Sequence, residues 1–131
     1  MLLEALIAIL IFSLSLMAMI GMQAVALRNV GEAKYRMDAT FLANQIISQM
    51  WVDRANLAAY AYDGGAPSAA LADWIAQVNQ LPGASDNPPS IEIGAGSQIT
   101  VTVYWQHPDQ ANQVPKPPPH SFIATGYINC C

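Results

Sequence analysis

The first part of the chain is a nearly continuous hydrophobic run that carries one acidic residue. Within the stretch from Met1 to Gly21, Glu4 stands near the start, and from Ala5 to Met22 no side chain is charged. A helix of about 20 residues spans the hydrocarbon core of a bilayer, which is about 30 Å thick. The pattern therefore predicts one membrane-spanning helix, in which Ser13 and Ser15 are the only uncharged polar side chains.

Several interpretations compete for this segment. A cleaved secretory signal is not expected, because such signals begin with a basic region and no Lys or Arg precedes Arg28. A buried core helix is disfavoured, since a chain of 131 residues could hardly surround so long an apolar rod. A single-pass anchor fits the length but leaves Glu4 unexplained, because a charge inside a membrane is costly without a partner. A position of Glu4 at the depth of the lipid headgroups is a further alternative.

After Gly21 the hydrophobic run becomes amphipathic, and no proline interrupts it before Pro67. Apolar residues at spacings of three and four form one stripe, the pattern of a helix that packs on a core. The stripe comprises Tyr35, Ala39, Leu42, Ile46 and Met50, and we expect Val25, Val30, Met37, Phe41 and Ile47 to widen it. We predict one helix from Leu2 to Val52, about 75 Å long, with Gly21 as the place where it bends or locally unwinds.

Shorter elements are predicted for the rest of the chain. Turn residues from Arg54 to Pro67 indicate a loop, and Ser68 is expected to N-cap a short helix. Alternating apolar residues predict strands at 91–93, 99–105 and 121–128. Five prolines within residues 107–120 predict an exposed loop with polyproline character. The predicted fold class is α+β, with the long N-terminal helix packed on a small antiparallel sheet head.

These patterns divide the chain into three parts. Residues 1–23 form the apolar half of the long helix, residues 24–52 its amphipathic half, and residues 53–131 a small α+β head with a C-terminal strand and tail. The three tryptophans, Trp51, Trp74 and Trp105, are expected to anchor a core or an interface rather than to form a ligand site.

Composition and charge narrow the classes of function. The net charge is −4 and the five basic residues are scattered, which argues against a nucleic-acid surface. His107, Asp109 and His120 fall in or beside loops, where we expect them to be solvated, and no catalytic arrangement emerges. Two cysteines are too few for a metal site. We therefore expect no enzymatic activity, no cofactor and no bound metal.

The start of the chain resembles that of a mature type IV pilin, in the residues Leu2-Leu3-Glu4-Ala5-Leu6-Ile7-Ala8. In that family a prepilin peptidase removes a basic leader, the new N-terminal residue is methylated, and a glutamate is the fifth mature residue. Glu4 stands one position earlier, so we expect one residue to precede Met1.

The resemblance implies roles for particular residues. It implies that Glu4 sets the axial register during assembly, because a buried carboxylate can be offset by the terminal ammonium of a neighbouring subunit. It also implies that the following side chains pack in the membrane and then in the filament core: Leu2, Leu3, Leu6, Ile7, Leu10, Ile11 and Leu14.

Later residues are similar to PilV-type minor pilins. They are Ala26 to Asn29, Ala39 to Ala43, Met50, Arg54, Trp74, Leu81-Pro82-Gly83, and a Thr/Val strand that ends in Trp105. The resemblance implies a single-pass protein of the bacterial inner membrane that later enters an extracellular filament. Its implied partners are other pilin subunits, the prepilin peptidase and the pilus assembly machinery. Motility, adhesion and DNA uptake are functions of such filaments, and the sequence does not choose among them.

The chain also departs from the family pattern. Many major pilins have a proline within the membrane segment, where this chain has Gly21, and close a loop with two separated cysteines. Here Cys130 and Cys131 are adjacent, so they form a strained ring, bridge to a neighbouring chain, or stay free. Two alternative functions stay open. A type II secretion pseudopilin shares the anchor pattern, and a membrane-tethered binding module would use Trp105 or the proline loop.

Overall fold

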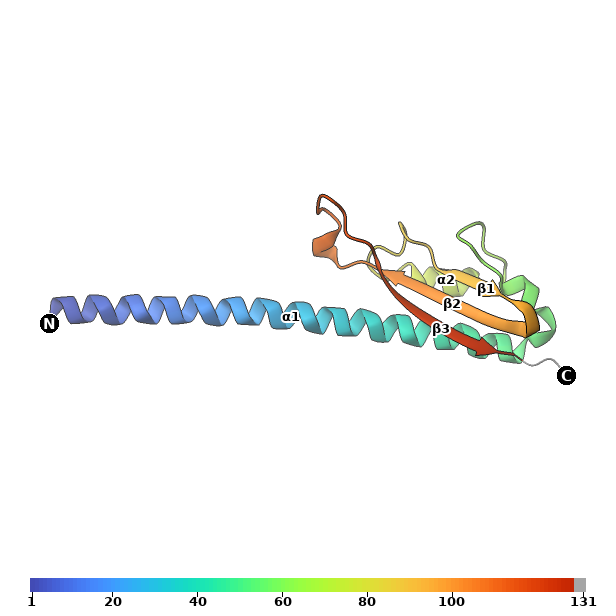
Figure 1. The fold of residues 1–131 in the computed structure, drawn as a ribbon, viewed down its shortest axis with the longest axis horizontal. Coiled ribbons are helices and arrows are strands. Elements are labelled where there is room, and N and C mark those ends of the chain that lie inside the picture. The colour runs from blue at the N-terminus through green and yellow to red at the C-terminus, as the bar shows by residue number, and fades with distance from the viewer. Residues whose placement is uncertain (129–131) are drawn as a thin grey trace. The chain divides into compact units, whose positions relative to one another are not determined.

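The computed structural model describes residues 1–128, so the three alternatives for Cys130 and Cys131 lie outside the described residues. The described chain forms two compact units, one of residues 1–33 and one that begins at Lys34. The predicted α+β fold, with a long N-terminal helix and a small antiparallel sheet, is confirmed (Figure 1). Its helices and strands are α1 (Leu2–Val52), α2 (Ala72–Val78), β1 (Ser90–Ile93), β2 (Gln98–Trp105) and β3 (His120–Tyr127).

Helix α1 begins and ends at the predicted residues. Its sequence is rich in Ala, Leu, Met and Ile and contains no proline, so nothing interrupts the backbone hydrogen bonds. The helix is continuous through Gly21. A bend or local unwinding at Gly21 stays a prediction.

The predicted stripe on the second half of α1 is confirmed, but it is narrower than expected. Its buried members are Ala39, Leu42, Ala43, Ile46 and Met50. Met37 and Phe41 were expected to widen the stripe and instead are 72% and 67% exposed. At about 100° per residue they lie about 160–200° from the centre of the buried stripe, on the opposite side of the helix. Val25 and Val30 are exposed as well.

Helix α2 buries Trp74, Ile75 and Val78, but its start was predicted wrongly. The N-cap is Leu71, which makes no side-chain cap bond. The Ser68 hydroxyl instead donates to the Ala59 carbonyl at 2.7 Å. The carbonyl of Ser68 accepts the backbone N–H of Leu71 at 3.0 Å, which forms a turn before the helix. Trp74 is buried, and its Nε1 donates to the Leu42 carbonyl at 2.9 Å.

The sheet has the strand order β1-β2-β3, and both neighbouring pairs are antiparallel. In the register, Val101 of β2 lies opposite Ile91 of β1 and Ala124 of β3. As predicted, one face of β2 supplies the core, through Ile99, Val101, Val103 and Trp105. Strand β3 begins at His120, one residue earlier than predicted. From His120 onward, every second side chain of β3 is partly buried. Two short 3-10 turns, Arg54–Tyr60 and Pro108–Gln110, occupy parts of the predicted loops.

Candidate functional site

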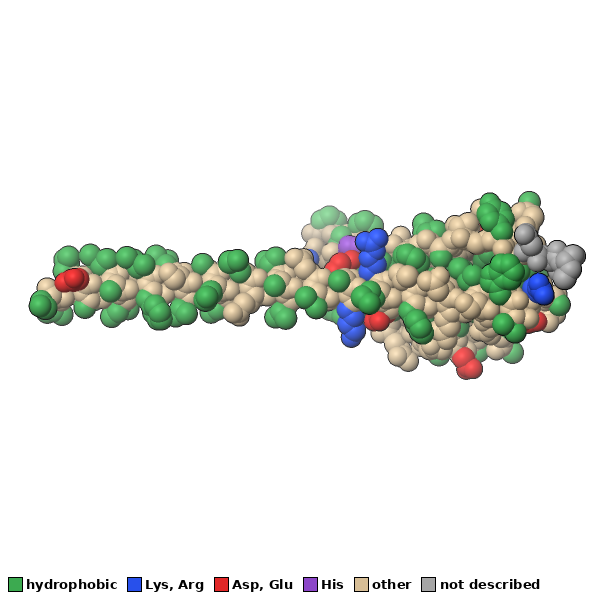
Figure 2. All heavy atoms as spheres, turned by 90° about the horizontal axis from the view of Figure 1, so that it is seen from below, with side chains coloured by type: hydrophobic (Ala, Val, Ile, Leu, Met, Phe, Trp, Pro, Cys, Tyr) green, Lys and Arg blue, Asp and Glu red, His purple; other side chains and the backbone are tan. Residues whose placement is uncertain are grey.

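The start of α1, residues 2–22, exposes an apolar surface all around the helix. The seven side chains predicted to pack in the membrane or the filament core are each between 51% and 83% exposed. The most apolar window of α1 has none of its residues buried, and α1 is long and apolar enough to cross a membrane. In Figure 2, hydrophobic side chains lie over the visible face of this segment. Exposed apolar surface of this extent marks a region that is covered by lipid or by other protein.

The polar groups within the apolar segment are satisfied by the helix itself. The Ser13 hydroxyl donates to the Leu10 carbonyl at 2.9 Å, and the Ser15 hydroxyl donates to the Ile11 carbonyl, also at 2.9 Å. A hydroxyl without a partner is costly in an apolar medium, and these bonds remove most of that cost. The two serines are therefore compatible with apolar surroundings on every side.

Glu4 lies in the first turn of α1 and its side chain is exposed. The N–H groups of a first turn have no helical acceptor, and the helix dipole favours a negative charge there. Within residues 1–128, no salt bridge to Glu4 is found. A carboxylate in this position can accept a hydrogen bond from a group outside its own chain, or form an ion pair with such a group.

The two histidines of the head are packed rather than solvated, contrary to expectation. The His107 side chain is 15% exposed, and its ring meets Tyr35 edge-on with centroids 6.1 Å apart. Its Nδ1 lies 3.4 Å from an Asp109 carboxylate oxygen. His120 stacks on Trp105 at 5.8 Å. Both histidines are therefore held by aromatic packing.

In the part of the chain that the structure describes, no three His, Cys, Asp or Glu side chains gather to hold a metal ion.

The tryptophans divide between the core and the surface. Trp74 and Trp105 are 2% and 3% exposed, which confirms their predicted role in the core. Trp51 is 45% exposed and does not belong to the core. Because Trp105 is buried, it cannot offer its ring to a ligand from solution, so the binding-module alternative would depend on the proline loop.

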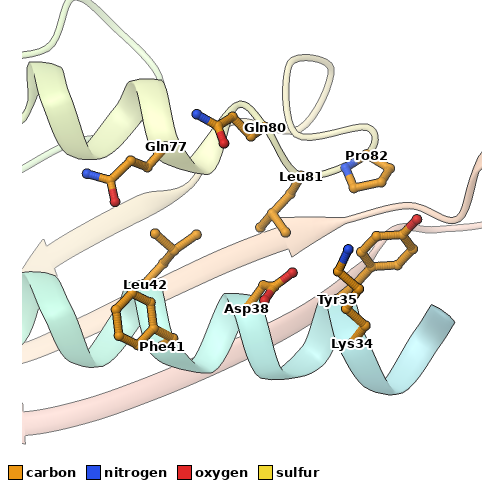
Figure 3. A pocket seen from close by; sticks show the side chains of 9 residues that line it. All are labelled: Lys34, Tyr35, Asp38, Phe41, Leu42, Gln77, Gln80, Leu81 and Pro82. Atoms are coloured by element: carbon orange, nitrogen blue, oxygen red, sulfur yellow. The ribbon is translucent and has the colours of Figure 1, made fainter. Parts of the chain in front are cut away.

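A groove lies between the second half of α1 and the segment that follows α2 (Figure 3). Its volume is about 520 Å³, within the range of ligand sites. Asp38 and Leu42 point toward it from α1, and Leu81 points toward it from the opposite wall. The remaining lining residues are Lys34, Tyr35, Phe41, Gln77, Gln80 and Pro82. The groove combines apolar and aromatic side chains with two opposite charges and two amides.

Sequence reasoning missed this groove and the outward position of Phe41. The helical period did contain the signal for Phe41, because a residue next to Leu42 and two after Ala39 cannot share their face. The groove had no such signal, since it joins α1 to residues about 40 positions later in the sequence. Only the packing of α2 on α1 creates it.

The comparisons with known proteins add no family to this description. No protein-family model, no curated protein sequence and no solved structure matches this chain.

Proposed function

We propose that the chain is a structural, non-catalytic subunit of a bacterial type IV pilus, of the PilV-type minor pilin class. The observation that carries the proposal is the start of α1, residues 2–22, which is exposed throughout and in which Glu4, in the first turn, is the one charged side chain. The resemblance of residues 2–8 to a mature pilin supports the same assignment.

In this proposal the apolar helix has two successive environments. It first holds the subunit in the inner membrane as a single span, and lipid covers its side chains. During assembly the subunit leaves the membrane, and the apolar side chains of neighbouring subunits replace the lipid. The exchange is favourable when helix packing and polar pairing outweigh the lipid contacts that are lost. The internal bonds of Ser13 and Ser15 suit both environments.

Glu4 has a separate role in the second environment. An unpaired carboxylate among apolar helices is costly, and pairing with a terminal ammonium of a neighbouring subunit offsets that cost. Only one axial offset brings the two charges together, so the pair selects the register between subunits. The partners in this proposal are other pilin subunits, with the prepilin peptidase and the assembly machinery acting before assembly.

The experiment replaces Glu4 and follows the protein from the membrane to the filament. Glu4→Ala should leave membrane insertion unchanged and reduce the amount in sheared surface filaments by about tenfold, the effect of losing roughly 1.4 kcal/mol. Glu4→Gln tests whether charge is required, and Val52→Ala is a control at an exposed residue of the same helix. Immunodetection in membrane and filament fractions measures both steps. Equal incorporation of Glu4→Ala would refute the register role, and co-purification with secretion components alone would identify a pseudopilin instead.

A further inference from the structure

A proline-rich segment of the head stands exposed to solvent. Residues 114–119 have the sequence Val-Pro-Lys-Pro-Pro-Pro. Val114 is 97% exposed, and Pro115 and Pro118 are also exposed. The bond between Val114 and Pro115 is cis, and the three consecutive prolines that follow, residues 117–119, favour the polyproline II conformation. This conformation loses little entropy on binding because it is already stiff. The segment therefore has the properties of a ligand for an aromatic groove.

The groove beside α1 has the side chains that such a segment requires. Tyr35, Phe41 and Pro82 supply flat apolar surfaces against which proline rings pack. The amides of Gln77 and Gln80 can donate to the carbonyls of a bound segment, which has no hydrogen bonds of its own. Asp38 places a carboxylate among these groups. Lys116 is the one cation of the segment, so it can pair with Asp38, whereas Lys34, the other charged residue that lines the groove, repels it.

Within its own chain, the proline segment is held by other residues. The Gln106 side chain donates to the Pro117 carbonyl at 3.1 Å, and Lys116 lies 3.5 Å from a carboxylate oxygen of Asp86. Neither Gln106 nor Asp86 lines the groove. The Lys116–Asp86 pair is exposed on both sides, and such pairs contribute little stability, so Lys116 can change partner at small cost.

We propose that this groove binds the proline segment, residues 114–119, of a second copy of the chain. Lys116 of one copy pairs with Asp38 of the other, and the prolines pack on Tyr35 and Phe41. The groove and the segment are different patches, so each copy uses both and the contact joins copies head to tail. This contact joins the second units of two copies and does not require that the chain be a pilin.

A peptide titration tests the groove by itself. A fluorescent peptide of residues 113–120 is added to the full chain in detergent micelles, and its anisotropy gives the affinity. We expect saturable binding that weakens at least about tenfold with Phe41→Ala, and also weakens with Asp38→Asn or with Lys116→Glu in the peptide. Lys34→Gln should strengthen binding, because it removes a charge that repels Lys116.

Met37→Ala is the matched control, since Met37 is as exposed on α1 as Phe41 but does not line the groove. Absence of saturable binding, or equal weakening by Met37→Ala and Phe41→Ala, would overturn the proposal.

Zero-length cross-linking then tests whether the occupant is a second copy. Equal amounts of unlabelled and nitrogen-15-labelled full chain are mixed in detergent and treated with a carbodiimide, which joins an amine to a nearby carboxylate. We expect a Lys116–Asp38 product that contains one labelled and one unlabelled peptide. A Lys116–Asp38 product within single chains only, or products of Lys116 with Asp86 only, would overturn docking between copies. Neither result depends on filament formation, so this proposal and the pilus assignment fail separately.

Discussion

At the residue scale, Asp53 and Tyr60 form a hydrogen-bonded pair directly after α1. The Tyr60 hydroxyl donates to Asp53 Oδ2 at 3.2 Å, and the Asn56 amide donates to Asp53 Oδ1 at 2.7 Å. Tyr60 is 2% exposed. Burial raises the pKa of the Tyr60 hydroxyl above its ordinary value, and the nearby Asp53 carboxylate raises this pKa further. Both effects disfavour the phenolate in the folded protein.

This arrangement predicts a loss of stability at alkaline pH. In the unfolded chain Tyr60 loses its proton near pH 10, its ordinary pKa. In the folded chain it keeps the proton to higher pH, so the folded state binds more protons than the unfolded state above about pH 10. The free energy of unfolding should therefore be highest below about pH 10 and fall as the pH rises through the pKa of the folded state. Urea unfolding of the full chain in micelles, followed by tryptophan fluorescence, measures it.

Tyr60→Phe isolates this residue from the other groups that titrate in the same range. The variant should lose about 0.5–1.5 kcal/mol at pH 8, the value of a typical hydrogen bond, and show a shallower decline above about pH 10. A decline as steep as that of the original chain would contradict the role given to Tyr60.

At the element scale, the turn after α2 forms the wall of the groove that faces α1. This turn packs against Gln106, the residue that follows β2. Gly83 has a φ of +72°, and a Cβ at this residue would lie 2.7 Å from the Cβ of Gln106. The Gln106 N–H donates to the Pro82 carbonyl at 2.8 Å, which holds the two backbones together. Only glycine meets both the conformation and the close approach.

Gly83→Ala should therefore destabilise the second unit by about 2–4 kcal/mol, from backbone strain together with the clash. Gly96→Ala is the matched control, because Gly96 has a φ of +70° but no atom within 4 Å of the added Cβ. It should cost only about 1 kcal/mol, from strain alone. Urea unfolding measures both variants, and equal losses would show that the contact with Gln106 is unimportant.

The same scale shows which elements could be predicted from the sequence. The bounds of α1 and the buried face of β2 follow from long periodic patterns, which local chemistry alone determines. The start of α2 does not, because a turn from Ser68 to Leu71 precedes the helix, and the Ser68 hydroxyl donates to the Ala59 carbonyl, nine residues earlier. The aromatic contacts of the two histidines could not be predicted either. His107 contacts Tyr35, which is distant in the sequence, and His120 contacts Trp105, which becomes its neighbour only through the pairing of β2 with β3.

At the scale of the whole molecule, the two units treat apolar side chains in opposite ways. The unit that begins at Lys34 buries most of its large apolar residues in one core, which includes Ile46, Trp74 and Val101. The unit of residues 1–33 leaves its large apolar residues exposed. Burial of apolar surface is the main favourable term in folding and association, so the first unit requires surroundings that the chain itself does not supply.

The most direct test identifies what surrounds the first unit. A photo-crosslinking amino acid replaces Leu10, which is 59% exposed, and cells are irradiated before and after filament assembly. We predict lipid adducts before assembly and adducts to other subunits in sheared filaments. If the cross-linking residue at position 10 forms adducts only with the head of its own chain in both states, the helix is buried within its own chain, and the proposal that lipid and then other subunits surround it is wrong.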